Sequence, residues 1–222
     1  MSTPAWFKAL PAVQALAQFE ANLACARLAN EPDGCGLWVS PWPATAPRPP
    51  AGFPIEIGLT GTDVLAGAYR CSSTLWPIAD GALAYVVLQH VLEFVVEPEE
   101  LLAEAARALR GHGQLLLFGL RPMSWARLRG NWRNSPTRWT AATNWVQVCR
   151  ALGLSDIKVT RFAVGWPSVT PESADWLNKT LPSLGSAYVL SARRRGVRMR
   201  PVVRDVRTSR LPALAQSGSW RA

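Results

Sequence analysis

His90 and Glu93 are two titratable side chains three residues apart. His90 directly follows the apolar run at 83–89, which places it at the mouth of an expected strand. An imidazole with an ordinary pKa of about 6.5 could serve there as a general base. The alternative is a histidine that only hydrogen-bonds its neighbouring loop. Glu93, three residues further on, could simply face solvent or cap a turn.

A second group of residues combines arginine with tryptophan. Residues 105–155 contain no acidic side chain, and this stretch holds Arg121, Arg127, Arg129, Arg133, Arg138, Trp125, Trp132 and Trp139. Arginine interleaved with aromatic residues can hold phosphates and stacked bases. The alternative is a solvated arginine face whose tryptophans fill the gap between a loop and the sheet.

The cysteines do not predict a metal site. The four cysteines form no C-x-x-C pair, and the sequence has only two histidines to accompany them. No common structural zinc spacing can be assembled from these residues. We therefore expect free thiols in a reducing compartment.

The segments around these residues predict strands that alternate with helices. The run at 83–89 predicts a strand buried on both faces, and 114–120 predicts a second one. Between them, Pro98 begins a helix with two glutamates in its first turn, and Gly111 stands just beyond its expected end. Ligands in such a sheet bind beyond the carboxyl ends of the strands. The sequence thus predicts a site around His90 and the residues that follow Leu120.

The remaining segments complete an α/β domain. We expect a Rossmann-like, doubly wound, mostly parallel sheet with an antiparallel strand pair at one edge. The expected elements are a helix over 5–29 with Pro11 splitting off its first turn, a first strand at 35–40, a proline-rich loop over 41–61 with a short edge strand at 55–59, an extended piece at 64–71, a helix over 139–152 closed by Gly153, and the edge pair at 157–164 and 187–192.

Length and charge divide the chain into a body and a tail. The 222 residues, 49% of them hydrophobic, can bury one sizeable core, which we assign to residues 1–192. Residues 193–222 hold nine arginines and one aspartate, a charge of +8 out of the total of +9. We expect this tail to have little fixed structure. It is either a solvated extension or a segment that makes weak, salt-sensitive contact with nucleic acid.

The amino-terminal residues do not predict export. They lack the basic start, long apolar stretch and cleavage site of a secretory signal, and no run approaches the ~20 apolar residues of a membrane span. We expect a soluble, cytoplasmic protein without membrane contact.

Several motifs resemble those of one enzyme family. They are LWPIAD at 75–80, QHVLEF at 89–94, PEELLAEAARALRGHGQLLLFG at 98–119 and RPMSWARLR from Arg121, followed by NWVQVCRALGLSDIKV and LGSAYVLSARRR. In these segments the chain resembles class I S-adenosylmethionine-dependent methyltransferases, specifically the small bacterial type 11 subgroup. The resemblance covers about half of the chain.

The resemblance implies a function and a set of site residues. It implies methyl transfer from S-adenosylmethionine to an acceptor that the sequence does not identify. His90 would be the catalytic residue. The cofactor would contact Ser72, Ser73, Ile78, Ala79, Asp80, Leu88 and Gln89, and the substrate would contact Gly119, Arg121 and Pro122.

The sequence departs from the family where the cofactor should be gripped. The family places a glycine-rich turn after its first strand, because the cofactor passes close to the backbone there. Here, in GCGLWVSPWP at 34–43, the two glycines precede the strand. Serines stand where an acidic residue is expected before the LWPIAD loop. The alternative function is therefore a catalytically inactive relative that acts as a binding or scaffold module. The question is whether a cavity lies beyond Val39, Ser72 and His90, or whether it is filled by Trp38, Trp42 and Trp76.

Overall fold

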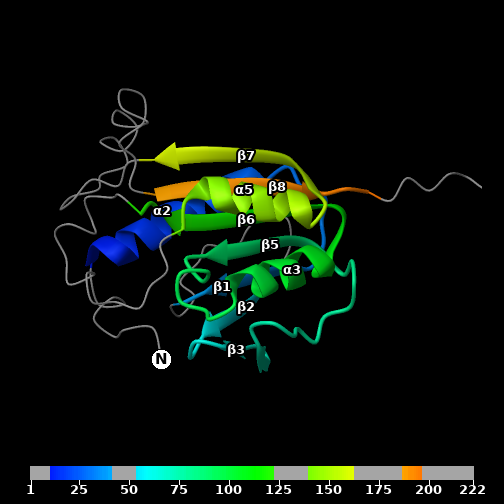
Figure 1. The fold of residues 1–222 in the computed structure, drawn as a ribbon, viewed down its shortest axis with the longest axis horizontal. Coiled ribbons are helices and arrows are strands. Elements are labelled where there is room, and N and C mark those ends of the chain that lie inside the picture. Colours follow the sequence, from blue (N-terminus) through cyan, green and yellow to red (C-terminus); the bar gives the residue numbers. More distant parts are fainter. Residues whose placement is uncertain (1–10, 42–53, 123–139, 163–186, 197–222) are drawn as a thin grey trace, which may run out of the picture.

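The computed structural model describes residues 11–41, 54–122, 140–162 and 187–196. These residues form an eight-stranded sheet in the order β4-β3-β2-β1-β5-β6-β8-β7 (Figure 1). The strands are β1 (Gly36–Ser40), β2 (Pro54–Leu59), β3 (Val64–Gly67), β4 (Arg70–Ser72), β5 (Leu83–Gln89), β6 (Leu109–Leu120), β7 (Leu154–Phe162) and β8 (Ala187–Arg194). The central strands β2, β1, β5 and β6 are parallel, and antiparallel pairs flank them at both edges.

Helices cover both faces of this sheet. Helix α2 (Pro11–Leu28) packs on one face, and α3 (Pro98–Ala108) and α5 (Ala142–Ala151) pack on the other (Figure 1). Strand β5 serves both layers, with Val86 and Leu88 on the α3 side and Tyr85 and Val87 on the α2 side. This two-sided burial explains why residues 83–89 are continuously apolar. The predicted doubly wound α/β fold is confirmed.

Helix α2 begins at Pro11, the residue predicted to separate a first turn from the main helix. Proline is tolerated in a first helical turn because its missing N–H would have no partner there. The buried stripe of this helix contains Leu16, Ala24 and Leu28, and also the carboxylate of Glu20, whose exposure is 0%. Residues 5–10, where that first turn was predicted, lie outside the described residues.

The end of α3 differs from the prediction. The helix starts at Pro98 as expected, but it stops at Ala108, and Leu109 already has an extended backbone. Leu109 is fully buried and pairs with Leu83, so the chain enters β6 before reaching Gly111. The predicted glycine cap is therefore wrong, because burying Leu109 in the sheet ends the helix earlier.

The segment at 55–59 was expected at the sheet edge and is not there. Strand β2 lies between β1 and β3, because residues 64–72 fold as a hairpin, β3 and β4, along its outer side. At the opposite edge, the antiparallel pair of β7 and β8 is confirmed. Helix α5 is also followed by Gly153 at a φ of 77°, as its expected end required.

Strand β8 extends past the expected boundary at residue 192. The guanidinium of Arg193 pairs with Glu31 and donates to the His112 carbonyl at 3.1 Å. Arg194 donates to the carbonyls of Arg107 and Leu109. Two of the tail arginines thus belong to the sheet, and residues 197–222 of the predicted tail lie outside the described residues.

The described ranges contain no helix long and apolar enough to cross a membrane. They also contain no group of three or more His, Cys, Asp or Glu residues that could hold a metal ion. Cys25, Cys35, Cys71 and Cys149 are free thiols, as expected.

Candidate functional site

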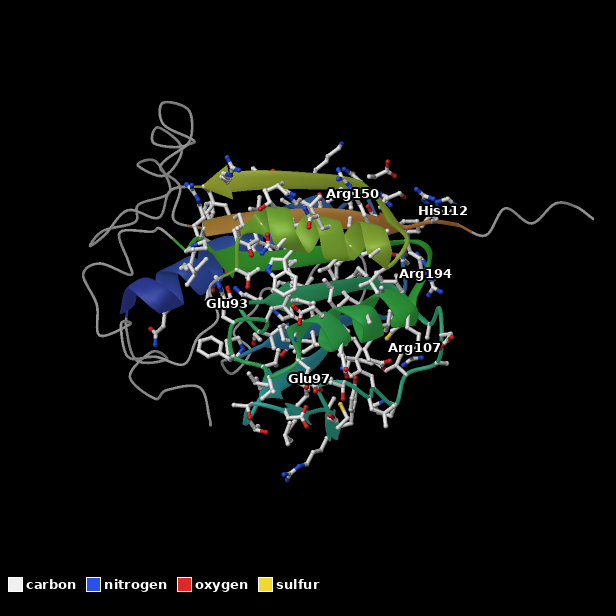
Figure 2. All side chains as sticks on the ribbon, in the orientation of Figure 1. Glu93, Glu97, Arg107, His112, Arg150 and Arg194 are labelled. Carbon is white, nitrogen blue, oxygen red and sulfur yellow. The ribbon has the colours of Figure 1, made fainter. Side chains whose placement is uncertain are left out.

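The strand order places a candidate site at the carboxyl ends of β1 and β5. From β1 the chain moves to β2 on one side and later to β5 on the other. Such a reversal leaves a crevice beyond the strand ends, where ligands bind in this class of sheet. Figure 2 shows Glu93 at this end of the sheet, and Arg107, His112 and Arg194 at the opposite end.

His90 lies at this edge, directly after β5, and is 1% exposed. Its Nε2 lies 2.9 Å from both carboxylate oxygens of Glu20 on α2. Its Nδ1 lies 3.3 Å from Oε1 of Glu93. Both ring nitrogens therefore face carboxylates, and an imidazolium with two N–H donors matches this arrangement.

The backbone of His90 is also unusual. Its φ of 51° lies in the left-handed region, which costs about 1–3 kcal/mol for a residue other than glycine. Its N–H donates to the Phe118 carbonyl at 3.1 Å. This bond and the two carboxylates hold the conformation in place.

The pKa of His90 departs from the ordinary value that the sequence analysis assumed. Burial lowers this pKa, but the carboxylates of Glu20 and Glu93 outweigh burial and raise it to about 10. The imidazole is then protonated at neutral pH and has no free lone pair with which to take a proton. The expectation of an unperturbed pKa is wrong, and catalysis by His90 stays a prediction that this geometry does not favour.

Glu93 was expected to face solvent or cap a turn, and it does neither. It is 7% exposed, and its Oε1 accepts the backbone N–H of Leu120 at 3.0 Å in addition to facing His90. Glu93 therefore ties the loop after β5 to the carboxyl end of β6.

Gln89 joins the same network. Its amide nitrogen donates to Glu20 and to the Ala17 carbonyl, both at 3.0 Å, and its amide oxygen accepts the indole N–H of Trp38 at 3.3 Å. Leu88 is fully buried in the core on the α3 side. Both residues stand at the edge where a cofactor was expected. The amide nitrogen and oxygen of Gln89 are already hydrogen-bonded within the protein, and Leu88 is packed in the core.

Glu20 is a functional candidate that the sequence analysis missed. It interrupts the apolar stripe of α2, three residues after Ala17 and four before Ala24. An acidic side chain on a buried helix face requires a partner, which is the signal that could have identified it.

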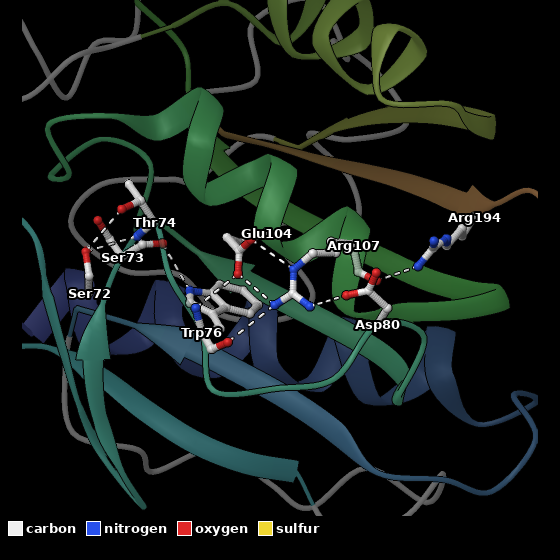
Figure 3. Close-up of polar contacts among 8 residues, drawn as sticks. All are labelled: Ser72, Ser73, Thr74, Trp76, Asp80, Glu104, Arg107 and Arg194. Carbon is white, nitrogen blue, oxygen red and sulfur yellow. Dashed lines mark hydrogen bonds and ion pairs between the residues drawn. The ribbon is translucent and has the colours of Figure 1, made fainter.

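Three of the predicted cofactor residues are seen in Figure 3, where Ser72 and Ser73 lie far from Asp80. Ser72 and Ser73 lie at the carboxyl end of β4, where both hydroxyls donate to Oδ1 of Asp63, at 3.1 and 2.5 Å. Ser73 is fully buried, and its carbonyl accepts the indole N–H of Trp76 at 3.0 Å. Both serine hydroxyls are thus occupied within the protein.

The loop from Trp76 to Asp80 lies beside α3, where the Trp76 N–H donates to Glu104 at 3.0 Å. Asp80 is exposed and pairs with Arg107, which also binds Glu104 at 2.8 Å. Ile78 packs against the rim of the core and Ala79 is exposed. The cofactor contacts of Ile78, Ala79 and Asp80 stay predictions, at a place away from the edge where ligands bind in this class of sheet.

The predicted substrate residues lie at the end of β6. Gly119 is opposite Tyr188 of β8, and a Cβ there would lie 2.4 Å from the tyrosine hydroxyl, so this glycine makes room for the ring. Arg121 and Pro122 follow β6 at the carboxyl edge and are half-buried. The structure thus brings these three residues close to the Glu93 loop, and their role in substrate binding stays a prediction.

The two glycines before β1 also have packing roles. A Cβ on Gly36 would lie 2.0 Å from the ring of Tyr85, and one on Gly34 would lie 2.7 Å from Cβ of Ala84. Both glycines lie at the amino end of β1, where the absence of a side chain lets Tyr85 and Ala84 of β5 pack closely. They cannot replace a glycine-rich turn beyond the carboxyl end.

Tryptophan occupies part of the region where a cavity was sought. Trp38 and Trp76 are 1% and 3% exposed, while Trp42 lies outside the described residues. The described residues leave a narrow hollow of about 190 Å³ beside Glu93, and no part of it is wide enough to hold a water molecule. A hollow without room for a water molecule is far smaller than the ~300–1,000 Å³ sites typical of small molecules. The hollow beside Glu93 is therefore not a cofactor-sized cavity.

Comparison with known proteins agrees with this fold. Residues 62–117 match a family model described as a methyltransferase domain, of type 11. A search of curated protein sequences finds no match.

Solved structures of low sequence identity share the architecture. A methyltransferase dependent on S-adenosylmethionine from Thermotoga maritima is 14% identical, with a TM-score of 0.52, over 80% of this chain and 90% of that one. Phosphoethanolamine N-methyltransferase 2 of Haemonchus contortus, in complex with S-adenosylmethionine, is 10% identical, with a TM-score of 0.58, over 80% of this chain and 53% of that one. The [4+2]-cyclase SpnF is 13% identical, with a TM-score of 0.51, over 83% of each chain.

The matched segment begins before β3 and contains β3, β4, β5 and α3 and most of β6, the region that carried the sequence resemblance. The likeness to solved structures extends beyond this segment, to 80% of the chain. Residues 62–117 therefore resemble a type 11 methyltransferase domain, and the chain has the fold of the S-adenosylmethionine-dependent methyltransferases to which it is similar.

Proposed function

We propose that this protein transfers a methyl group from S-adenosylmethionine to an acceptor that remains to be identified. The observation that carries the proposal is the methyltransferase-domain match over residues 62–117, which include β5 with its charged carboxyl end. The Haemonchus contortus neighbour, with S-adenosylmethionine bound to the same fold, supports the choice of cofactor.

Methyl transfer asks little of acid and base side chains. The reaction is an in-line displacement at a sulfonium, and alignment of donor and acceptor supplies much of the rate. A protonated His90 is compatible with such a reaction, because it holds the Glu93 loop in place without accepting a proton.

The described residues fit the cofactor only in part. The polar side chains at the ends of β4 and β5 already have partners within the protein. Ser73 donates to Asp63, and Gln89 accepts from Trp38. Residues 42–53, which follow β1 where the family has its glycine-rich turn, lie outside the described residues. Binding of S-adenosylmethionine by this chain is therefore part of the proposal.

Calorimetric titration of the full-length protein with S-adenosylmethionine and S-adenosylhomocysteine tests the proposal. We expect saturable binding of both, followed by methyl transfer to an acceptor found by screening. If neither compound binds at millimolar concentration, the protein is not a methyltransferase.

The second candidate function is a catalytically inactive domain that acts as a binding or scaffold module. The occupied carboxyl edge favours it, because Trp38, Gln89 and Glu20 fill space between β1, β5 and α2. The cyclase SpnF illustrates that a similar fold carries a differently named activity, so the fold alone does not decide the reaction. A rise in melting temperature with S-adenosylmethionine would count against this candidate.

A further inference from the structure

One oxygen of Glu93 has no hydrogen-bond partner among the described residues. Oε1 faces His90 and accepts the Leu120 N–H, whereas Oε2 is buried and makes no hydrogen bond. Burying a polar atom without a partner is costly, more so for a charged group. Such an atom in a native structure calls for an explanation, and a bound ion or ligand is one that fits an acceptor beside a hollow.

This oxygen belongs to a residue that lines the hollow at the carboxyl ends of β5 and β6. The opposite wall is formed by Thr140, Trp145 and Tyr188, and the two aromatic side chains are almost fully buried. The Tyr188 hydroxyl donates to the Thr140 carbonyl at 3.2 Å, so its proton is not directed at Glu93. Glu93 therefore contributes an unsatisfied acceptor to a mostly apolar and aromatic hollow.

The charges around Glu93 do not balance. Two acidic side chains, Glu20 and Glu93, enclose one histidine, His90, so acidic groups outnumber basic ones by one in this buried cluster. Tyr188 does not change this sum, because burial and then the charge of Glu93 raise its pKa and keep it neutral. The ion pairs formed by the described residues give Glu93 no second cation. A buried negative charge of this kind is stabilised by a positive ligand.

We propose that Oε2 of Glu93 binds a positively charged organic group, an ammonium or a sulfonium, in this hollow. Trp145 and Tyr188 would favour the same charge, since aromatic faces attract organic cations. Because the hollow is narrow, the cation enters by displacing part of its lining. His90 and Glu20 act as positioning residues that hold the Glu93 carboxylate. The inference rests on the proposed function only for the identity of the cation. Under that function, the cation is either the methyl donor or an amine acceptor.

The first experiment uses n-butylammonium chloride as the probe and n-butanol as its neutral analogue. Binding to the full-length protein is followed by the NMR signal of the Trp145 indole N–H. We expect a saturable shift with butylammonium and none with butanol. Equal responses to the two compounds would overturn the proposal, and this comparison needs no variant.

Two matched variants locate the charge. Glu93→Gln removes the charge and keeps the acceptor for the Leu120 N–H, whereas Glu97→Gln removes an exposed charge four residues away (Figure 2). Butylammonium should bind about tenfold or more weakly to E93Q, and unchanged to E97Q. Unchanged binding to a folded E93Q variant would reject Glu93 as the ligand.

Titrations with S-adenosylmethionine and S-adenosylhomocysteine then identify the source of the cation. If the sulfonium is the ligand, E93Q weakens binding of the first compound and spares the second, which has no charge on sulfur. If the amine acceptor is the ligand, E93Q leaves both affinities unchanged and butylammonium binds together with either compound. If butylammonium binds through Glu93 but neither adenosyl compound binds at all, the inference stands and the proposed methyl transfer fails.

Discussion

The imidazole of His90 lies 2.9 Å from the carboxylate of Glu20, which comes 70 residues earlier in the chain. This pair joins α2 to the carboxyl end of β5, and both residues are almost completely buried. On the α2 side, the edge of the sheet where ligands are expected is therefore covered by a buried ion pair as well as by apolar side chains.

Replacing Glu20 with glutamine should destabilise the protein strongly. The substitution removes the closer ion-pair partner of His90 and leaves only the carboxylate of Glu93, 3.3 Å away. Breaking a buried ion pair in this way costs about 3–5 kcal/mol. Urea unfolding of E20Q measures the loss. The exposed substitution Glu99→Gln on α3 is the control and should change the free energy of unfolding by no more than ~0.5 kcal/mol. A loss no greater than that of E99Q would show that the ion pair does not stabilise the fold.

The free energy of unfolding should fall as the pH rises above 7. The pKa of His90 is about 10 in the folded protein and about 6.5 in the unfolded chain. A pKa raised by folding stabilises the protein fully below the unfolded value, and this stabilisation is lost as the pH rises through the folded value. Urea unfolding measured between pH 6 and pH 10 should show the decline. In His90→Asn, which tolerates the positive φ, the slope should be smaller. Equal slopes in the two proteins would contradict the charge assigned to His90.

Gly36→Ala should weaken the sheet. The new Cβ would lie 2.0 Å from the ring of Tyr85, which is fully buried and cannot move aside. Overpacking of this kind costs about 1–3 kcal/mol, seen as a lower melting temperature. Gly61→Ala is the matched control, because no atom lies within 4 Å of its added Cβ. A similar melting temperature for both variants would mean that Gly36 does not make room for Tyr85.

Ser73→Ala should reduce stability more than cofactor affinity. Its buried hydroxyl donates to Asp63 at 2.5 Å, and a hydrogen bond to a charged group contributes about 1.5–3 kcal/mol. Ser72→Ala, which removes the longer bond of 3.1 Å at a half-buried position, should cost less. Chemical unfolding and calorimetry with S-adenosylmethionine separate the two effects. A fall in cofactor affinity at unchanged stability would instead support the cofactor contact that the sequence predicts for Ser73.

Deleting residues 197–222 should leave the stability of the sheet unchanged. The contacts of Arg193 with Glu31 and of Arg194 with the end of α3 are all retained in that variant. Deleting 193–222 removes them and should lower the melting temperature. If the basic tail contacts nucleic acid, the shorter deletion also removes a salt-dependent affinity for RNA. Unchanged RNA affinity across salt concentrations would exclude that role for residues 197–222.

The sequence determined the elements whose patterns are local. The run at 83–89 and the proline and acids at 98–100 predicted β5 and the start of α3, because strand burial and helix polarity leave their mark on neighbouring residues. The same logic failed at Gly111, since the pairing of Leu109 with Leu83 is a contact between distant segments. It also made residues 55–59 an edge strand, because no local signal shows that β3 will pair beside them.

The candidate site depended more on tertiary structure. The sequence by itself placed His90 at a strand end, but its charge follows from Glu20 on another element, and no spacing rule connects positions 70 residues apart. Glu93 changed from an expected surface residue to a buried one because β6 supplies the Leu120 N–H that it binds. Asp80, in contrast, matched a family motif and proved to pair with Arg107 at the other edge of the sheet. Sequence patterns record which face of an element is buried, whereas the protonation and the partners of a buried polar group depend on which elements fold together.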